Sequence, residues 1–235
     1  MNALRAPHYA LMIATLAIGL AADVHTGFIG QMLISVVVWA GLFYLLGQVD
    51  LHERRAAFAC LAIATIGEIV LSLGWGLYTY RLDNIPHFVP PGHVLMLLLG
   101  VGLARRMPDQ LAMAILGGAT IYAVGAGIAG LDTFASVLLI LLLALAIAFP
   151  QHRRLYASTF LLSLVLELYG TWLGNWTWMQ AVPKLRLVTT NPPALAGVFY
   201  ATLDACVLAA MLVLARRFNR QTAGAGAFRA AGQSL

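Results

Sequence analysis

Long apolar blocks dominate the pattern of hydrophobic and polar positions along the chain. Each block is long enough, or nearly so, to cross a bilayer, for which about 20 residues are needed. The eight blocks lie at residues 8–23, 27–47, 56–80, 90–104, 108–130, 133–149, 155–178 and 192–215. Backbone polar groups in hydrocarbon must pair within their own segment, and the blocks do not alternate as barrel strands do. The pattern therefore predicts an all-α integral membrane protein with about eight transmembrane helices.

Basic residues between the blocks predict an orientation. If the N-terminus is cytoplasmic and each block crosses once, eleven arginines fall on the cytoplasmic side, and only Arg81, Lys184 and Arg186 fall outside. This asymmetry is typical of the positive-inside rule. We therefore predict a multi-pass protein of the cell inner (plasma) membrane with both termini cytoplasmic.

The two ends of the chain allow further expectations. The first block has one early arginine and small residues before Asp23, so it also has the build of a cleavable signal peptide. Its removal would leave seven helices. The last segment, residues 219–235, is rich in alanine, glycine, glutamine and serine. We predict that it is a disordered cytoplasmic tail.

Composition and charge narrow the class of protein. The chain of 235 residues is 61% hydrophobic and 10% charged, whereas soluble domains are about 25% charged. The net charge of +5 comes from basic pairs between apolar blocks, so the expected partner is the lipid bilayer and not nucleic acid. The chain contains no G-x-S-x-G, H-E-x-x-H or P-loop motif, which leaves serine hydrolases, zinc proteases and ATPases without support.

Two segments about a hundred residues apart share one pattern. Residues 76–80 read GLYTY and residues 174–178 read GNWTW, both of the form G-x-aromatic-T-aromatic. Glu68 precedes the first glycine by eight residues, Glu167 precedes the second by seven, and a proline pair follows each motif. An interfacial aromatic belt would explain the rings alone. We predict a parallel duplication of a four-helix unit, residues 1–106 and 107–218.

Three acidic residues lie near the middle of apolar blocks. Glu68, Glu167 and Asp204 would each cost about 3 kcal/mol at the bilayer centre if ionised and unpaired. Each of the three acids lies on one helix face with polar and aromatic residues at spacings of three and four. We predict that they converge on one intramembrane pocket as catalytic acids. Hydrogen bonding across helices is the structural alternative.

The aromatic motifs and their surroundings supply the expected lining of that pocket. The candidate substrate-binding residues are Trp75, Tyr78, Tyr80, His93, Asn175, Trp176, Trp178, Asn191 and Tyr200. His87 and His93 flank a proline pair, but their H-x5-H spacing fits no zinc signature. We therefore expect neither a metal nor another cofactor.

The residues around both motifs resemble a known family. Glu68 with G-x-Y-x-Y and Ile85-Pro86 is similar to the front half of bacterial and archaeal carotenoid-biosynthesis membrane proteins of the carotenoid hydratase type. G-x-W-x-W with Val182-Pro183 and Asn191 is similar to the back half. The likeness covers about 70 residues in two patches. It departs from the family at residues 90–93, PPGH, where a tryptophan-containing segment is expected.

A fainter likeness is to small polytopic terpene cyclases of fungal meroterpenoid pathways. They use intramembrane acids, a part that Glu68 and Asp204 would play here.

These likenesses imply a lipid-soluble isoprenoid substrate. A carboxylic acid would protonate a double bond, aromatic faces would stabilise the carbocation, and water or an internal alkene would capture it. The sequence alone leaves two other hypotheses open, a proton-coupled small-molecule transporter and a non-catalytic membrane scaffold.

Overall fold

The computed structural model describes residues 4–232, with side chains up to Arg216. Its regular secondary structure is helical apart from two three-residue strands, β1 (Tyr78–Tyr80) and β2 (Trp176–Trp178). The helices are α1 (Ala6–Asp23), α2 (Phe28–Gln48), α3 (Leu51–Glu68), α4 (Val89–Ala104), α5 (Asp109–Ile128), α6 (Thr133–Ala148), α7 (Arg153–Leu173) and α8 (Gly197–Gly232). Two shorter helices, η1 (Ile69–Trp75) and η2 (Pro150–His152), join α3 to Gly76 and α6 to α7. The predicted all-α architecture is confirmed, and the described residues contain eight α-helices.

Five segments of the described chain are long and apolar enough to cross a membrane. They are α1, α2, α3 together with η1, α5, and residues Gly197–Arg216 of α8. Helices α6 and α7 are bent by 106° at η2, and this pair counts as a sixth candidate. The chain is thus a multi-pass membrane protein by helix length and hydropathy, with five or six candidate spans.

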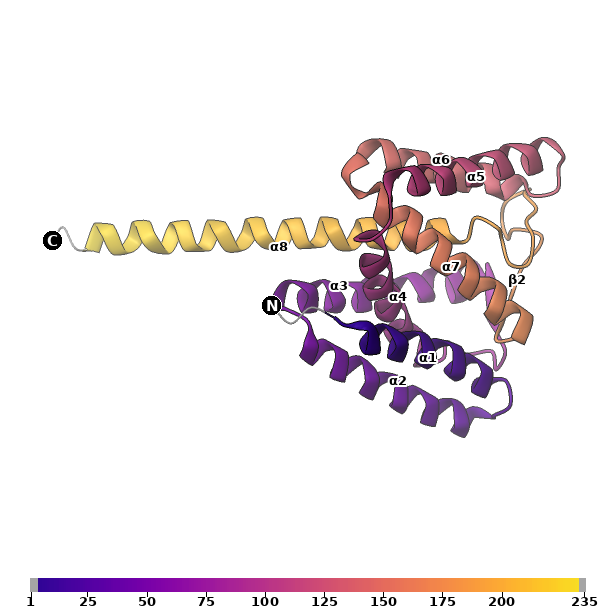
Figure 1. Cartoon of the computed structure of the whole chain (residues 1–235), viewed down its shortest axis with the longest axis horizontal. Coiled ribbons are helices and arrows are strands. Elements are labelled where there is room, and N and C mark those ends of the chain that lie inside the picture. The colour runs from indigo at the N-terminus through magenta and orange to yellow at the C-terminus, as the bar shows by residue number, and fades with distance from the viewer. Residues whose placement is uncertain (1–3, 233–235) are drawn as a thin grey trace.

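The sequence contains more apolar blocks than the structure has candidate spans, and helix α4 shows why. It has 16 residues, fewer than the other central helices, and most of its side chains are buried among its neighbours. A helix that is apolar on every side suits burial in protein as well as in lipid. In Figure 1, α4 also runs across the direction of α3 and α8. Eight full crossings therefore stay a prediction.

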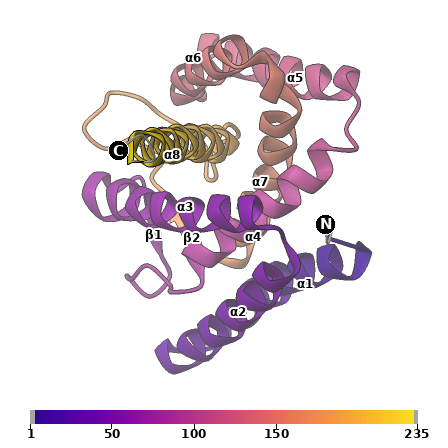
Figure 2. The same ribbon diagram turned by 90° about the vertical axis from the view of Figure 1, so that its left-hand side faces the viewer.

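Four helices form the centre of the molecule. Helices α4 and α8 each pack against both α3 and α7. The α1–α2 hairpin and the α5–α6 hairpin lie on opposite sides of this centre, as Figure 1 and the view along α8 in Figure 2 show. Helix α1 begins at the end from which α8 runs out, and β1 and β2 lie at the other end (Figure 1).

The two aromatic motifs are strands, which corrects the predicted helices at 56–80 and 155–178. Gly76 and Gly174 end the preceding helices in the left-handed conformation, with φ of 76° and 87°, a backbone state that glycine adopts without a steric cost. The strands then pair antiparallel, with Thr79 opposite Thr177.

The π-helical turn η1 accounts for the different spacing of the two glutamates. Residues Ile69–Trp75 form a π-helix, whereas α7 is α-helical up to Leu173. A π turn holds an additional residue compared with an α turn. Glu68 therefore precedes its glycine by one residue more than Glu167 does. This match is local, and a duplication of the whole four-helix unit stays a prediction.

The domain boundaries at 106 and 218 likewise stay predictions. Residues 219–232 of the tail that we predicted to be disordered belong to helix α8, and their side chains are not among those described. The side of the membrane on which either terminus lies also stays a prediction.

Candidate functional site

The paired strands bring the two glutamates to one place. In each strand the two aromatic residues are buried and the threonine between them is exposed. Antiparallel pairing sets Tyr78 opposite Trp178 and Tyr80 opposite Trp176. All four rings therefore point from one face of the strand pair toward the helices that carry the glutamates, because alternate side chains of a strand share a face.

Glu68, at the end of α3, accepts hydrogen bonds from β1, the strand that follows it in the sequence. Its Oε2 lies 2.9 Å from the Tyr78 hydroxyl and 2.7 Å from the Tyr80 hydroxyl. Its Oε1 lies 2.9 Å from Nε2 of His93, on α4. Burial, together with the Glu68 carboxyl, raises the pKa of Tyr78 and of Tyr80 well above the usual value. Both phenols therefore stay protonated at neutral pH and can donate to Glu68.

Glu167, on α7, has the same relation to β2. Its Oε2 accepts from Nε1 of Trp176 at 2.8 Å and from Nε1 of Trp178 at 2.9 Å. Its Oε1 accepts from the Tyr200 hydroxyl, on α8, at 3.1 Å. The carboxyl side chains are thus buried but fully engaged, which offsets the free energy of removing them from water.

Both glutamates line one cavity of about 390 Å³. The rings of both strands also line it, together with His93, Phe199 and Tyr200. The rest of the wall consists mainly of apolar side chains from α1, α3, α4 and α8. The predicted convergence of Glu68 and Glu167 on one aromatic chamber agrees with this arrangement.

The cavity reaches the outer surface of the bundle where α3 passes into η1. Ile66 and Val70 line it, yet they are 62% and 53% exposed. The wall of the cavity is therefore continuous with the apolar outer surface of the bundle.

Aromatic contacts connect the two carboxyl groups across the cavity. The His93 and Tyr200 rings lie 4.9 Å apart between centroids, and the Tyr78 and Trp178 rings lie 4.5 Å apart. The partners of Glu68 therefore touch the partners of Glu167. The two glutamates belong to one polar and aromatic cluster.

Asp204, the third predicted acid, does not lie in this cluster. It is buried in α8, where its Oδ2 accepts a hydrogen bond of 2.6 Å from Thr159 Oγ1 on α7. It is absent from the residues that line the cavity. The convergence expected of three acids therefore holds for two, while the third follows the structural alternative of bonding across helices.

Three predicted substrate-binding residues also do not line the cavity. Trp75 donates from Nε1 to the Pro183 carbonyl at 2.7 Å. Asn191 accepts at Oδ1 from the Trp178 backbone N–H at 2.9 Å, which holds β2 in place. Asn175 joins a polar network near the start of β2.

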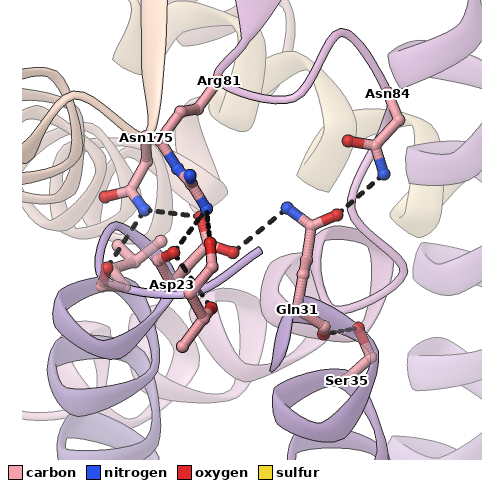
Figure 3. A network of polar contacts seen from close by, with 8 residues as sticks. Asp23, Gln31, Ser35, Arg81, Asn84 and Asn175 are labelled. Atoms are coloured by element: carbon pink, nitrogen blue, oxygen red, sulfur yellow. Dashed lines mark hydrogen bonds and ion pairs between the residues drawn. The ribbon is translucent and has the colours of Figure 1, made fainter. Parts of the chain in front are cut away.

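This network centres on Asp23, at the end of α1, and is drawn in Figure 3. The Asp23 carboxylate accepts from Gln31 and from Asn175, both at 3.1 Å, and lies 3.5 Å from the Arg81 guanidinium. Gln31 in turn accepts from Asn84 at 2.7 Å. Because Arg81 follows β1 directly and Asn175 precedes β2 directly, the network fixes the strand pair against α1 and α2.

The sequence reading missed the Asp23 network. Its only signal was a set of polar residues at the edges of apolar blocks, which is also how helix ends look. The sequence also led us to expect no metal site. Among the residues that the structure describes, no group of three or more His, Cys, Asp or Glu side chains is placed to hold a metal ion.

No known protein family matches the chain, and no curated protein or solved structure matches it either. The resemblance to carotenoid hydratases therefore stays a prediction that rests on the two motif patches.

Proposed function

We propose that this protein is a membrane enzyme that acts on a prenyl lipid, a carotenoid or another terpenoid, by acid-initiated hydration or cyclisation inside the cavity. The observation that carries the proposal is the position of two buried glutamates on one apolar cavity walled by aromatic rings. Such a cavity combines a proton source with faces that favour a cation.

Carbocation chemistry needs both of these features. A carboxylic acid positioned at a carbon–carbon double bond accelerates its protonation by about 10²–10⁴-fold. The resulting cation is attracted to aromatic faces by roughly 0.5–2 kcal/mol for each ring, more when water is excluded. The rings of Tyr78, Tyr80, Trp176 and Trp178 surround the carboxyl groups.

The lipid-facing edge of the cavity supports a hydrophobic substrate. Ile66, on α3, and Val70, on η1, belong both to the cavity wall and to the outer surface of the bundle. A prenyl chain can extend along this edge while its reacting double bond sits beside a carboxyl group. A water-soluble substrate would find few polar partners on the same wall.

We also propose that the two halves arose by parallel duplication of a four-helix unit, which would give eight crossings with both termini cytoplasmic. The matched glycine and strand segments support this. So does a second pair of contacts, in which Arg54 Nε donates to the Leu46 carbonyl and Arg153 Nε donates to the Ala146 carbonyl. Each contact closes the turn before α3 or α7.

A proton-coupled transporter is the second candidate. It is favoured by the place of the cavity between α3 and α4 of one half and α7 and α8 of the other, since rocking halves around a central site are a common transport mechanism. Reconstituted liposomes separate the candidates. An enzyme converts a prenyl lipid without a proton gradient, whereas a transporter moves a solute only while the gradient persists.

The direct test is expression in a host whose membrane contains prenyl lipids, followed by lipid extraction and mass spectrometry. Wild-type protein should produce a lipid with the mass of one added water or an isomer of unchanged mass. Glu68→Gln should lose the product. Glu53→Gln is the matched control, because Glu53 bonds Arg105 at the surface, remote from the cavity wall. Identical lipid profiles for wild type and Glu68→Gln would contradict the proposal.

A further inference from the structure

The two carboxyl groups differ in what their hydrogen-bond partners can do. An indole N–H donates and never accepts. Trp176 and Trp178 both donate to Oε2 of Glu167, and two donors leave this oxygen no room for a proton. Its other oxygen accepts from the Tyr200 hydroxyl at 3.1 Å. Three donated hydrogen bonds stabilise the ionised form of this carboxyl group, and none of the three partners is an imidazole that could exchange a proton with it.

Glu68 has a partner of another kind. Its Oε1 lies 2.9 Å from His93 Nε2, and an imidazole nitrogen can donate a proton or accept one. This contact is satisfied equally by a carboxylate with a protonated imidazole and by a carboxylic acid with a neutral imidazole. The second ring nitrogen, Nδ1 of His93, is buried without a hydrogen-bond partner among the described residues. The proton can therefore move between the two side chains.

The charges around this pair come from few groups. Tyr78 and Tyr80 face Glu68 from β1, Tyr200 stacks on His93 from α8, and Glu167 lies beyond Tyr200 on α7. Within the described chain no lysine or arginine lines the cavity. His93 is thus the cavity residue able to carry a positive charge there.

We propose that Glu68 and His93 share the mobile proton and form the acid–base couple of the site, whereas Glu167 is a fixed anion that stabilises the cation. This division of roles rests on the proposed function.

The reaction step balances with water as the one co-reactant. The couple gives its proton to the less substituted carbon of a double bond, so a C–H bond forms and a tertiary cation develops at the neighbouring carbon. Glu167 and the indole faces stabilise that charge. Water then forms the C–O bond, and its proton returns to the couple. In a cyclisation, an internal alkene attacks instead, and the couple takes a proton from the cyclic cation. Nothing is oxidised or reduced.

Infrared spectroscopy of the purified protein in lipid nanodiscs tests the assignment without any substrate. A protonated carboxyl group has its own C=O stretching band, which disappears on ionisation. Spectra across a pH titration should show a titrating band that Glu68→Gln removes and Glu167→Gln leaves. Asp204→Asn identifies any contribution of the third buried acid.

His93→Gln is the second variant. Glutamine keeps a donor near Glu68 Oε1 but cannot take up a proton, so the titration midpoint of the Glu68 band should shift. Loss of the band in Glu167→Gln, its persistence in Glu68→Gln, absence of any titrating carboxyl band, or an unmoved midpoint in His93→Gln would each overturn the assignment.

The outcome is separate from that of the proposed function. If the infrared result is as expected but no prenyl lipid is converted, the enzyme proposal fails and the proton-sharing pair stands. If lipid is converted but Glu167 carries the titrating proton, the enzyme proposal stands and this assignment fails.

Discussion

The Glu68 end and the Glu167 end of the cavity share one backbone plan and differ in chemistry. In both, a left-handed glycine follows the helix, and a strand returns two ring donors to Oε2 of the glutamate. The donors are phenols on one side and indoles on the other. The remaining oxygen meets His93 at one end and Tyr200 at the other. The backbone thus fixes where the carboxyl groups lie, and the ring types decide whether they can exchange a proton.

The same comparison explains one glycine. The ring of Trp176 lies over Gly170, where an added Cβ would stand 2.2 Å from the indole Cη2 atom. In the other half, Ser72 lies at the matching place, and its hydroxyl donates to the Tyr78 carbonyl at 3.1 Å. The indole of Trp176 therefore needs a residue without a side chain at position 170.

The largest expected effect separates the two glutamates. Glu68→Gln should lower turnover of a prenyl lipid by about 10²–10⁴-fold, because it removes the general acid. Glu167→Gln should lower it by about 10²–10³-fold, because it removes charge stabilisation but leaves the proton donor. Turnover measured with folded protein in nanodiscs gives both values. Full activity in Glu68→Gln would break the comparison.

A change at Gly170 tests the room beneath the indole. Gly170→Ala should destabilise the protein by about 1–3 kcal/mol, the usual penalty for overpacking, and should weaken the Trp176 bond to Glu167. Ser72→Ala removes only a hydrogen bond, for which about 0.5–1.5 kcal/mol is expected. Thermal unfolding in one lipid composition measures both. No loss of stability in Gly170→Ala would show that the indole does not occupy the space above Gly170.

The ring donors provide a finer test. Trp178→Phe removes an N–H that bonds the Glu167 carboxylate, and such bonds to charged groups contribute about 1.5–3 kcal/mol. Tyr80→Phe removes a hydroxyl from Glu68, which shares its proton with His93, so about 0.5–1.5 kcal/mol is expected. The free energy of unfolding, measured for both variants and for the wild type, tests this difference. A larger loss for Tyr80→Phe would reverse the assigned charge states.

Asp204→Asn should have the smallest effect on turnover. Asp204 bonds Thr159 and does not line the cavity, so turnover per folded molecule should change by about twofold, equivalent to about 0.4 kcal/mol. The main effect should be a fall in the free energy of unfolding, because Asn keeps the size of the side chain but weakens the hydrogen bond to Thr159. A loss of turnover comparable to that of Glu68→Gln would return Asp204 to the catalytic group.

Much of this fold and part of the site can be predicted from the sequence. Apolar blocks locate the helices because a long apolar run in lipid must pair its backbone polar groups within its own segment, as a helix does. The repeated motif leads to Glu68 and Glu167, because each glutamate lies two turns before a motif of the same form.

The remaining features depend on contacts that sequence patterns do not show. Hydropathy alone predicts that α4 spans the membrane, since burial in protein and burial in lipid select the same apolar residues. Strands β1 and β2 are three residues long and exist because each pairs with the other across about a hundred residues. Asp23 looks like a helix end until Arg81 and Asn175 reach it.

The central claim is that pairing of β1 with β2 holds the two glutamates at one cavity, and a disulfide cross-link tests it most directly. Thr79 and Thr177 are exposed and directly opposed, and opposed residues of antiparallel strands lie about 4.5–5.5 Å apart between Cα atoms, within the range that a disulfide spans. In a Cys60→Ala, Cys206→Ala background, Thr79→Cys with Thr177→Cys should form an intramolecular disulfide under mild oxidation, detected by peptide mass mapping without reduction. Failure to cross-link, with both thiols open to alkylation, would contradict the account.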